Sequence, residues 1–278
     1  MFSDEEWQNV QDQFQGFLQT PDLFNGNRFD LFQLPVSDLT LPRNFFVDDK
    51  YRLGQRLEFL MEEALRQNSN FDILAKSQQI KAKKQTVGEL DFILKNTIAN
   101  KTIHMEMAYK FYLYDPSISN DPDECWIGDN RRDSLLKKAK KLREKQFPLI
   151  HSEDAFAVRQ TLGIENKEIN QQLSFKAQLF LPQGMTNFPG GMCNPDCLAG
   201  NWLTLSQFEK MLEERPWVYI PKKNDWVIKP VIQNSGAKWQ PKKEILDWVQ
   251  KTINHQGSKL IWSMDHDNNM HRDFVIWW

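Results

Sequence analysis

The sequence predicts an α/β (α+β) fold in which a mixed central sheet begins with an antiparallel three-stranded meander and is flanked by helices. An amphipathic helical pattern over residues 52–67 is the first observation behind this prediction. Three runs with strand-like alternation follow it, at residues 71–83, 88–94 and 102–114. A further alternating run at 173–182 comes after a helical segment, and such a strand, helix, strand crossover makes the sheet mixed.

The chain has 278 residues, of which 40% are hydrophobic and 12% aromatic, so it is long enough to bury a sizeable core. We expect three parts: an N-terminal helical wrap at 1–47, a core at 48–182, and an aromatic-rich α/β extension at 183–278 that packs on the core. Within the extension the patterns predict helices at 205–214 and 241–253, a hairpin over 217–230 and a last strand at 274–278.

The helix predicted at 52–67 carries a glutamate at the edge of its apolar face. Glu58 falls beside Leu65 at the margin of that face. A carboxylate in this position reaches any site against which the helix packs. The alternative is an exposed side chain next to Glu62 and Glu63.

The two runs at 88–94 and 102–114 predict a hairpin whose register follows from its loop. If residues 97–100 form the loop, Asn96 pairs with Lys101, and the same register brings Asp91 opposite Glu106. Like charges at cross-strand spacing repel each other unless a cation compensates them. Converging carboxylates suit a hard divalent cation, Mg²⁺ or Mn²⁺, which makes Asp91 and Glu106 candidate metal ligands.

Other polar side chains share the face of this acid pair. Lys110 lies there and is a candidate for holding a phosphate or orienting an attacking water; its alternative role is a diagonal partner for Glu89. His104 is a candidate base or modulator, or a histidine that is merely hydrogen bonded on a strand. The alternative for the whole face is a solvated surface balanced by Lys110 and Lys95.

The order of these residues resembles the PD-(D/E)XK nuclease superfamily: a helix glutamate, Gly-Glu-Leu-Asp at 88–91, then a strand with a second acid and a lysine. The resemblance implies a restriction-endonuclease-like core, with Glu58, Asp91, Glu106 and Lys110 as catalytic residues. It departs from the superfamily at Ala108, because the superfamily has a lysine at this spacing. Lys110 is the nearest replacement.

At closer range the chain resembles an uncharacterised bacterial family, domain of unknown function 1853. The resemblance spans most of the chain and brings no activity with it. It implies that Gln146 points back at the site. The residues that carry it are 88–91, 104–114, Trp126, Ile127, Gly128, Asp133, Leu135, Lys138 and Gln146.

The segment that contains the candidate site is also the basic part of the chain. Residues 51–150 carry 18 basic and 14 acidic side chains, whereas the whole chain has a net charge of −2. A helix predicted at 133–146 contributes Lys137, Lys138 and Lys141 as candidate phosphate contacts. The alternative is that these lysines only keep an amphipathic helix soluble.

Tryptophans are concentrated in the C-terminal half, where they either stack on bases or fill a core. Together these patterns predict a metal-dependent nuclease, or alternatively an inactive nuclease-like fold that binds nucleic acid or a protein. We expect a cytoplasmic protein with no membrane span, because no apolar run is long enough and the first residues are acidic. The sequence carries no signal for a particular protein partner or oligomeric state.

Overall fold

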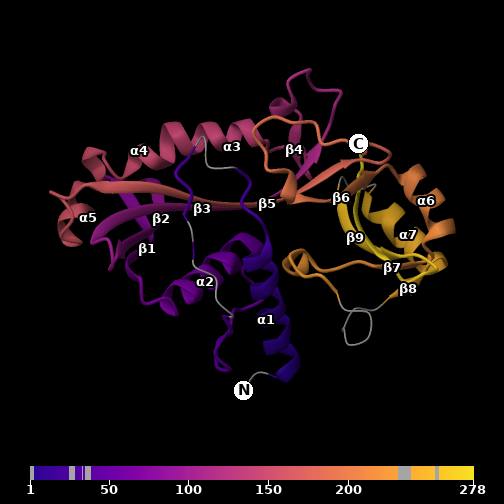
Figure 1. Cartoon of the computed structure of the whole chain (residues 1–278), viewed down its shortest axis with the longest axis horizontal. Helices are drawn as coiled ribbons and strands as arrows, with labels where there is room; N and C mark the ends of the chain where they lie inside the picture. The colour runs from indigo at the N-terminus through magenta and orange to yellow at the C-terminus, as the bar shows by residue number, and fades with distance from the viewer. Residues whose placement is uncertain (1–2, 25–28, 33, 35–38, 231–238, 254–256) are drawn as a thin grey trace.

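The structure is a computed structural model, and it describes residues 3–24, 29–32, 34, 39–230, 239–253 and 257–278. A single mixed sheet runs through the molecule in the order β1-β2-β3-β5-β6-β10-β9-β7-β8, with β4 paired to β3 beside this path. Helices cover both faces of the sheet (Figure 1). The predicted α/β class and mixed sheet are therefore confirmed. The strands are β1 (Phe71–Ala82), β2 (Gln85–Asn96), β3 (Lys101–Tyr114), β4 (Trp126–Gly128), β5 (Ile169–Pro182), β6 (Leu198–Leu203), β7 (Trp217–Tyr219), β8 (Gln240–Pro241), β9 (Lys259–Met264) and β10 (Met270–Val275).

Two longer helices, α1 and α2, lie on one face of the sheet, and shorter helical segments lie on the other (Figure 1). Ser3 caps α1 through a hydrogen bond from the Glu6 backbone N–H, in a capping box. The helix ends before Pro21, which cannot continue it. The helices are α1 (Asp4–Gln19), α2 (Leu53–Arg66), α3 (Leu135–Lys141), a π-helical turn (Leu142–Gln146), α4 (Phe147–Leu149), α5 (Phe156–Thr161), α6 (Leu205–Glu214) and α7 (Lys242–Ile253).

The predicted meander is confirmed, because β1 pairs with β2 and β2 with β3, both antiparallel. The β2–β3 ladder has the predicted register, from Asn96 opposite Lys101 to Phe92 opposite Met105. Strand β3 separates two apolar cores. Met105 and Met107 belong to the core under α1 and α2, whereas Ala108 belongs to the core under α3.

The crossover from β3 to β5 passes through α3, the π-helical turn, α4 and α5. Strand β5 then pairs parallel to β3 from Thr102 opposite Ile169 to Leu113 opposite Phe180. It begins earlier than the 173–182 run predicts. The predicted crossover is confirmed, and the sequence 133–146 forms α3 followed by a π-helical turn rather than one continuous α-helix.

The C-terminal part continues the same sheet, because β6 pairs parallel with both β5 and β10. The helices predicted at 205–214 and 241–253 are confirmed as α6 and α7. The hairpin predicted over 217–230 is wrong: β7 pairs with β8 and β9 instead. Trp226 and Val227 are buried in the core beside α1, and residues 226–227 do not form a strand of the sheet. The last strand, β10, ends at Val275, earlier than predicted.

In the described part of the helical wrap predicted over residues 1–47, the structure has one helix, α1. After α1 the chain runs alongside β5, with isolated bridges from Asp22 to Lys176 and from Leu31 to Leu173. Residues 1–2, 25–28, 33 and 35–38 of the predicted wrap lie outside the described residues.

Candidate metal centre

The candidate site lies where β2 and β3 separate. The ladder between them ends at Phe92 and Met105, one rung before Asp91 and Glu106. Instead of a backbone pair, the Asp91 carboxylate accepts a hydrogen bond from the Met107 backbone N–H through Oδ2, at 2.8 Å. The side chain thus takes the place of the missing ladder partner. This holds the Asp91 carboxylate against β3 at the fork.

Glu106 is fully buried beside this fork, and both of its oxygens have partners. His104 Nε2 lies 2.9 Å from Oε1, and Gln146 Nε2 donates to Oε2. Gln146 in turn accepts a hydrogen bond from Lys138 Nζ through Oε1, at 2.9 Å. A chain of contacts therefore runs from the α3 ammonium through the Gln146 amide to the Glu106 carboxylate.

The two carboxyl groups are close enough to influence each other's protonation. Burial, and after it the charge of Glu106, raises the pKa of Asp91 to about 7. Burial also raises the pKa of Glu106 to about 7, while the Lys138 ammonium and the hydrogen bond with Asp91 oppose the rise. Carboxyls this close titrate as a pair. Near neutral pH the pair therefore retains a proton that isolated carboxyls would have released.

Lys138 provides the ammonium that faces the pair. Burial lowers its pKa, whereas the charges of Asp91 and Glu106 raise it. Lys110 has a different partner: its Nζ lies 2.7 Å from Asp133 Oδ2, and both side chains are about one-third exposed. The structure thus brings together Asp91, Glu106 and Lys138, with Lys110 directed to the Asp133 carboxylate.

Glu58 reaches the fork from α2, on the other face of the sheet. Burial, and then the charges of Asp91 and Glu89, raises the pKa of Glu58 to about 7. The Glu58 side chain, which was predicted at the margin of the apolar face, is therefore half-buried rather than solvated. Lys76, which opposes this rise, is paired with Glu62 at 2.7 Å.

His104 is a buried neutral imidazole. Burial lowers its pKa to about 4, although the Asp91 charge acts in the opposite direction. A neutral ring donates through one nitrogen only, and its contact with Glu106 is made by Nε2. Nδ1 has no hydrogen-bond partner among the described residues, and the ring packs edge-on against Phe147.

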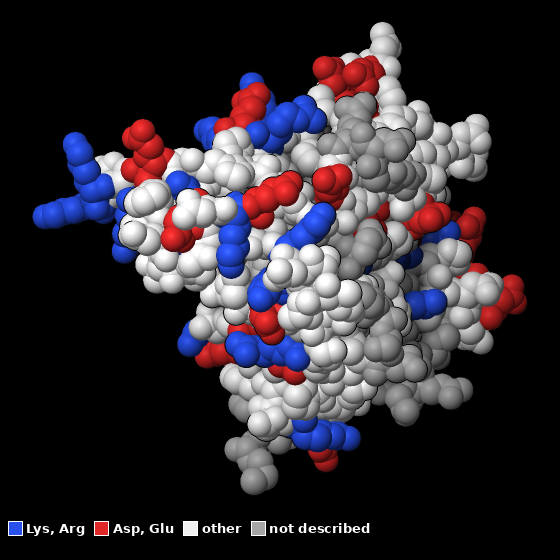
Figure 2. Space-filling model, turned by 60° about the vertical axis from the view of Figure 1, so that its left-hand side comes forward, with Lys and Arg blue, Asp and Glu red and all other residues white. Residues whose placement is uncertain are grey.

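The two other lysines predicted as phosphate contacts, Lys137 and Lys141, are exposed on the helical segment. The charge of Lys141 lowers the pKa of Glu106, so it lies within electrostatic reach of the pair. Lysines, arginines and acids are interspersed on the face shown in Figure 2, without a broad surface of one sign.

Sequence reasoning treated Lys138 as a phosphate contact and missed its place beside the acid pair. Leu135 and Leu142, three residues before it and four after it, are both fully buried. At 100° per residue Lys138 lies on the same face as these leucines. The helical spacing of Lys138 from these two leucines is the feature of the sequence that could have predicted its inward direction.

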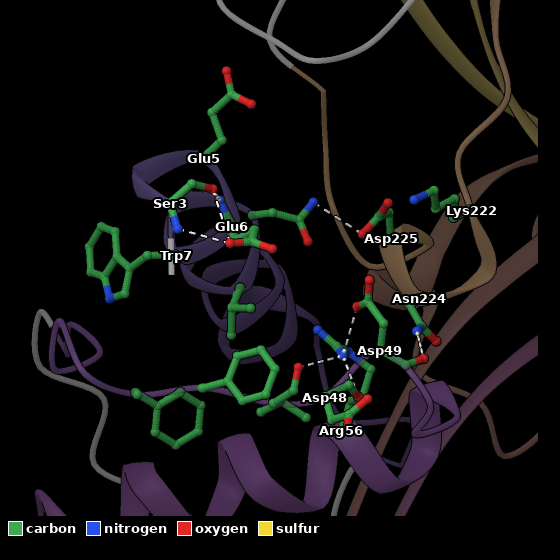
Figure 3. A pocket seen from close by; sticks show the side chains of 15 residues that line it. Ser3, Glu5, Glu6, Trp7, Asp48, Asp49, Arg56, Lys222, Asn224 and Asp225 are labelled. Carbon is green, nitrogen blue, oxygen red and sulfur yellow. Dashed lines mark hydrogen bonds and ion pairs between the residues drawn. The ribbon is translucent and has the colours of Figure 1, made fainter. Parts of the chain in front are cut away.

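A wide cavity of about 1100 Å³ lies elsewhere, between α1, α2 and the 222–225 segment (Figure 3). Its buried feature is Arg56, which is 1% exposed and lies 3.2 Å from Asp49 Oδ1. Arg56 also donates to Gln13 and to the Val47 carbonyl. These contacts join α1, α2 and the loop before α2. The acids at the rim of the cavity therefore balance the positive charge of the Arg56 guanidinium.

The donor set at the fork fits a small hard cation. Mg²⁺ is commonly held by one or two carboxylates together with water and substrate phosphate. Asp91 and Glu106 supply two carboxylates whose mutual repulsion a cation relieves. Across the described ranges, the chain has no group of three or more His, Cys, Asp or Glu side chains that could hold a metal ion.

The fold and site define an α/β protein with a buried acid pair and a lysine at a fork in a mixed sheet. A family model described as "Domain of unknown function (DUF1853)" matches residues 3–275, so the chain belongs to this family. No curated protein and no solved structure matches the chain. None of the helices in the described part of the chain has the length and apolar character needed to cross a bilayer.

Proposed function

We propose that this protein is a metal-dependent nuclease with a restriction-endonuclease-like core, which hydrolyses phosphodiester bonds of nucleic acid. The observation that carries the proposal is the buried pair of Asp91 and Glu106, with the pKa of each raised to about 7, beside the ammonium of Lys138. Perturbed acids that converge with a lysine are typical of catalytic sites.

In this proposal Asp91 and Glu106 hold Mg²⁺ or Mn²⁺. The cation, when bound, supplies Lewis acidity and lowers the pKa of a coordinated water. His104 and Gln146 keep the Glu106 carboxylate in place through one oxygen each. Glu58, whose pKa is about 7, is positioned on the α2 side to accept a proton through a water molecule.

We assign to Lys138 the role that the resemblance gave to Lys110. Its ammonium is partly buried and faces both acids, so it can neutralise charge that develops on a phosphoryl group. The position of Ala108 supports this assignment, because that side chain is buried in the core that also contains Leu135 of α3. The helix that covers Ala108 also carries Lys138, so α3 can supply the ammonium that this strand position lacks.

A second candidate is an inactive nuclease-like fold that binds nucleic acid or a protein. Two observations favour it: Ala108 stands where the superfamily has lysine, and both oxygens of Glu106 are already hydrogen bonded within the protein. In this case the acid pair is a structural remnant, and its protonation keeps the fold stable without a cation.

A cleavage assay with Mn²⁺ and Mg²⁺ on plasmid DNA, single-stranded DNA and RNA separates the two candidates. The Asp91→Ala variant should abolish metal-dependent cleavage, because it removes one of the two ligands. Asp72→Ala, an exposed acid on β1, is the matched control and should cleave like the wild type. Cleavage that survives in Asp91→Ala contradicts the mechanism. Calorimetric titration of Mn²⁺ is a second test: if no binding heat depends on Asp91 and Glu106, the result favours the inactive module.

A further inference from the structure

A second cavity, of about 660 Å³, lies between the turn after β4, the 220–226 segment, α7 and the start of β9. Its volume falls in the range of small-ligand pockets, roughly 300 to 1000 Å³. We call it the lysine–tryptophan pocket. The side chains that decide its chemistry are Asp129, Lys222, Lys223, Glu244, Trp248 and Lys259.

Two ammonium groups in this pocket compete for one carboxylate. Lys223 Nζ lies 3.4 Å from Asp129 Oδ2, and the Asp129 side chain is 22% exposed. Burial, and then the Lys223 charge, lowers the pKa of Lys259, while Asp129 raises it. Three lysines, at 222, 223 and 259, and two acids, Asp129 and Glu244, line the cavity, so the charges of its lining favour an anion.

An indole forms an open wall beside these lysines. Trp248 on α7 is 45% exposed, and Lys259 Nζ lies 5.6 Å from the centre of its ring. Trp226, on the other side, is buried and carries Lys223 Nζ at 4.7 Å from its ring centre. Trp226 thus packs against Lys223 from the core, whereas Trp248 offers an accessible aromatic surface.

A phosphate and an aromatic base are the two groups that this arrangement matches. We propose that the lysine–tryptophan pocket binds a nucleotide unit, with its phosphate between Lys223 and Lys259 and its base stacked on Trp248. Base stacking on exposed aromatics combined with lysine contacts to phosphate is how single strands are bound without sequence preference.

Strand β3 connects the acid pair to the turn at one edge of the pocket. Gly128, just before Asp129, pairs with Tyr112 of β3, six residues beyond Glu106. At a rise of about 3.3 Å per residue this is roughly 20 Å along β3. The choice of a nucleic-acid strand as the source of the nucleotide rests on the proposed function, whereas the pocket's chemistry does not.

The test measures binding without cleavage. The full-length Asp91→Ala protein in EDTA is titrated into a fluorescently labelled 12-nucleotide single-stranded DNA, and binding is followed by anisotropy. Adding Trp248→Ala should weaken binding about fivefold or more, because one stacked base is lost. Trp217→Ala is the matched control, since Trp217 is 44% exposed on β7 outside the pocket, and it should leave the affinity unchanged.

Two further arms identify the contact and the source. Lys259→Gln should weaken binding and lower the slope of log Kd against log salt concentration by roughly 0.7, as for one lost phosphate contact to a single strand. Competition by adenosine monophosphate identifies a free nucleotide as a ligand, and binding of the strand alone identifies nucleic acid; either supports the pocket. Equal affinities of Trp248→Ala and Trp217→Ala, or no binding of either probe, overturn the proposal. This assay does not depend on cleavage, because it contains no metal and the protein lacks Asp91. Binding here, together with no cleavage by the wild-type protein in Mn²⁺, would refute the nuclease and leave the pocket in place.

Discussion

The Lys110 ammonium lies 2.7 Å from the Asp133 carboxylate, at the start of the helical segment that crosses the sheet. Spacing along β3 explains this partner. Lys110 is four residues beyond Glu106, or about 13 Å along an extended strand, which is a long reach back to the fork. Asp133 lies just before α3, and the same helix brings Lys138 over the acid pair.

Replacing Lys138 by glutamine should therefore reduce metal-dependent cleavage by about a hundredfold or more, since a charge-stabilising donor beside the reacting group is lost. The neighbouring Lys137→Gln, an exposed lysine, should change the rate by less than about threefold. Steady-state cleavage rates of the two variants at pH 8 give the comparison. Equal rates would return the role to another lysine, and Lys110→Gln would then be the next variant to measure.

Asp91→Asn should stabilise the metal-free protein at pH 8. The pKa of Asp91 is raised to about 7 in the fold, above its ordinary value near 4, so the folded state binds more protons than the unfolded chain between these pH values. Stability is then lost as pH rises through this window, and it stays low at pH 8. The amide removes this cost while its oxygen still accepts from Met107.

We expect a gain of roughly 1 to 3 kcal/mol at pH 8 and little change at pH 4, from denaturant unfolding in EDTA. Asp72→Asn, an exposed acid on β1, serves as control and should have no effect at either pH. A destabilised Asp91→Asn protein at pH 8 would show that the carboxylate is satisfied without a cation.

Binding of Mn²⁺ should depend steeply on pH around neutrality. Asp91 and Glu106 must both be charged to hold the cation, and each has its pKa raised to about 7. The affinity measured by calorimetry should therefore fall by at least about tenfold from pH 8 to pH 6, with proton release on binding. An affinity that is flat over this range would place the metal on other ligands.

Gly200 lies on β6, the strand that connects β5 to β10, and replacing it tests how closely β6 and β10 approach. A Cβ at this position would lie 1.7 Å from the Arg272 carbonyl oxygen of β10, so the backbone must shift. Gly200→Ala should destabilise the protein by about 3 kcal/mol. In Gly54→Ala, where nothing lies within 4 Å of the new methyl group, stability should rise by about 0.5 kcal/mol. Thermal unfolding of both proteins makes the comparison, and similar midpoints would contradict the close approach at Gly200.

The parts of the site that follow from local periodicity could be predicted from the sequence. The register of β2 and β3 and the margin position of Glu58 depend on the spacing within single elements, and the structure has both. The separation of the strands at Asp91 could not be predicted, because a carboxylate competes there with a backbone partner for the Met107 N–H.

The hairpin predicted over 217–230 was wrong for a related reason. Its alternation suits a strand, but Trp226 packs against Phe111 of β3 with ring centroids 5.3 Å apart. Burial of a large aromatic side chain against a distant strand outweighs the local preference. Periodicity within a segment does not show which distant surface is available to it.

Strand β5 has neighbours on both sides, β3 on one and β6 on the other. Cutting the chain after residue 182 would thus leave the last part of β5, from Leu179 to Pro182, without its partner strand, in a strand whose side chains are largely buried. Such an edge invites intermolecular pairing. Shortened versions of the protein for biochemical work would be expected to aggregate, and point variants of the full chain are the sound way to dissect it.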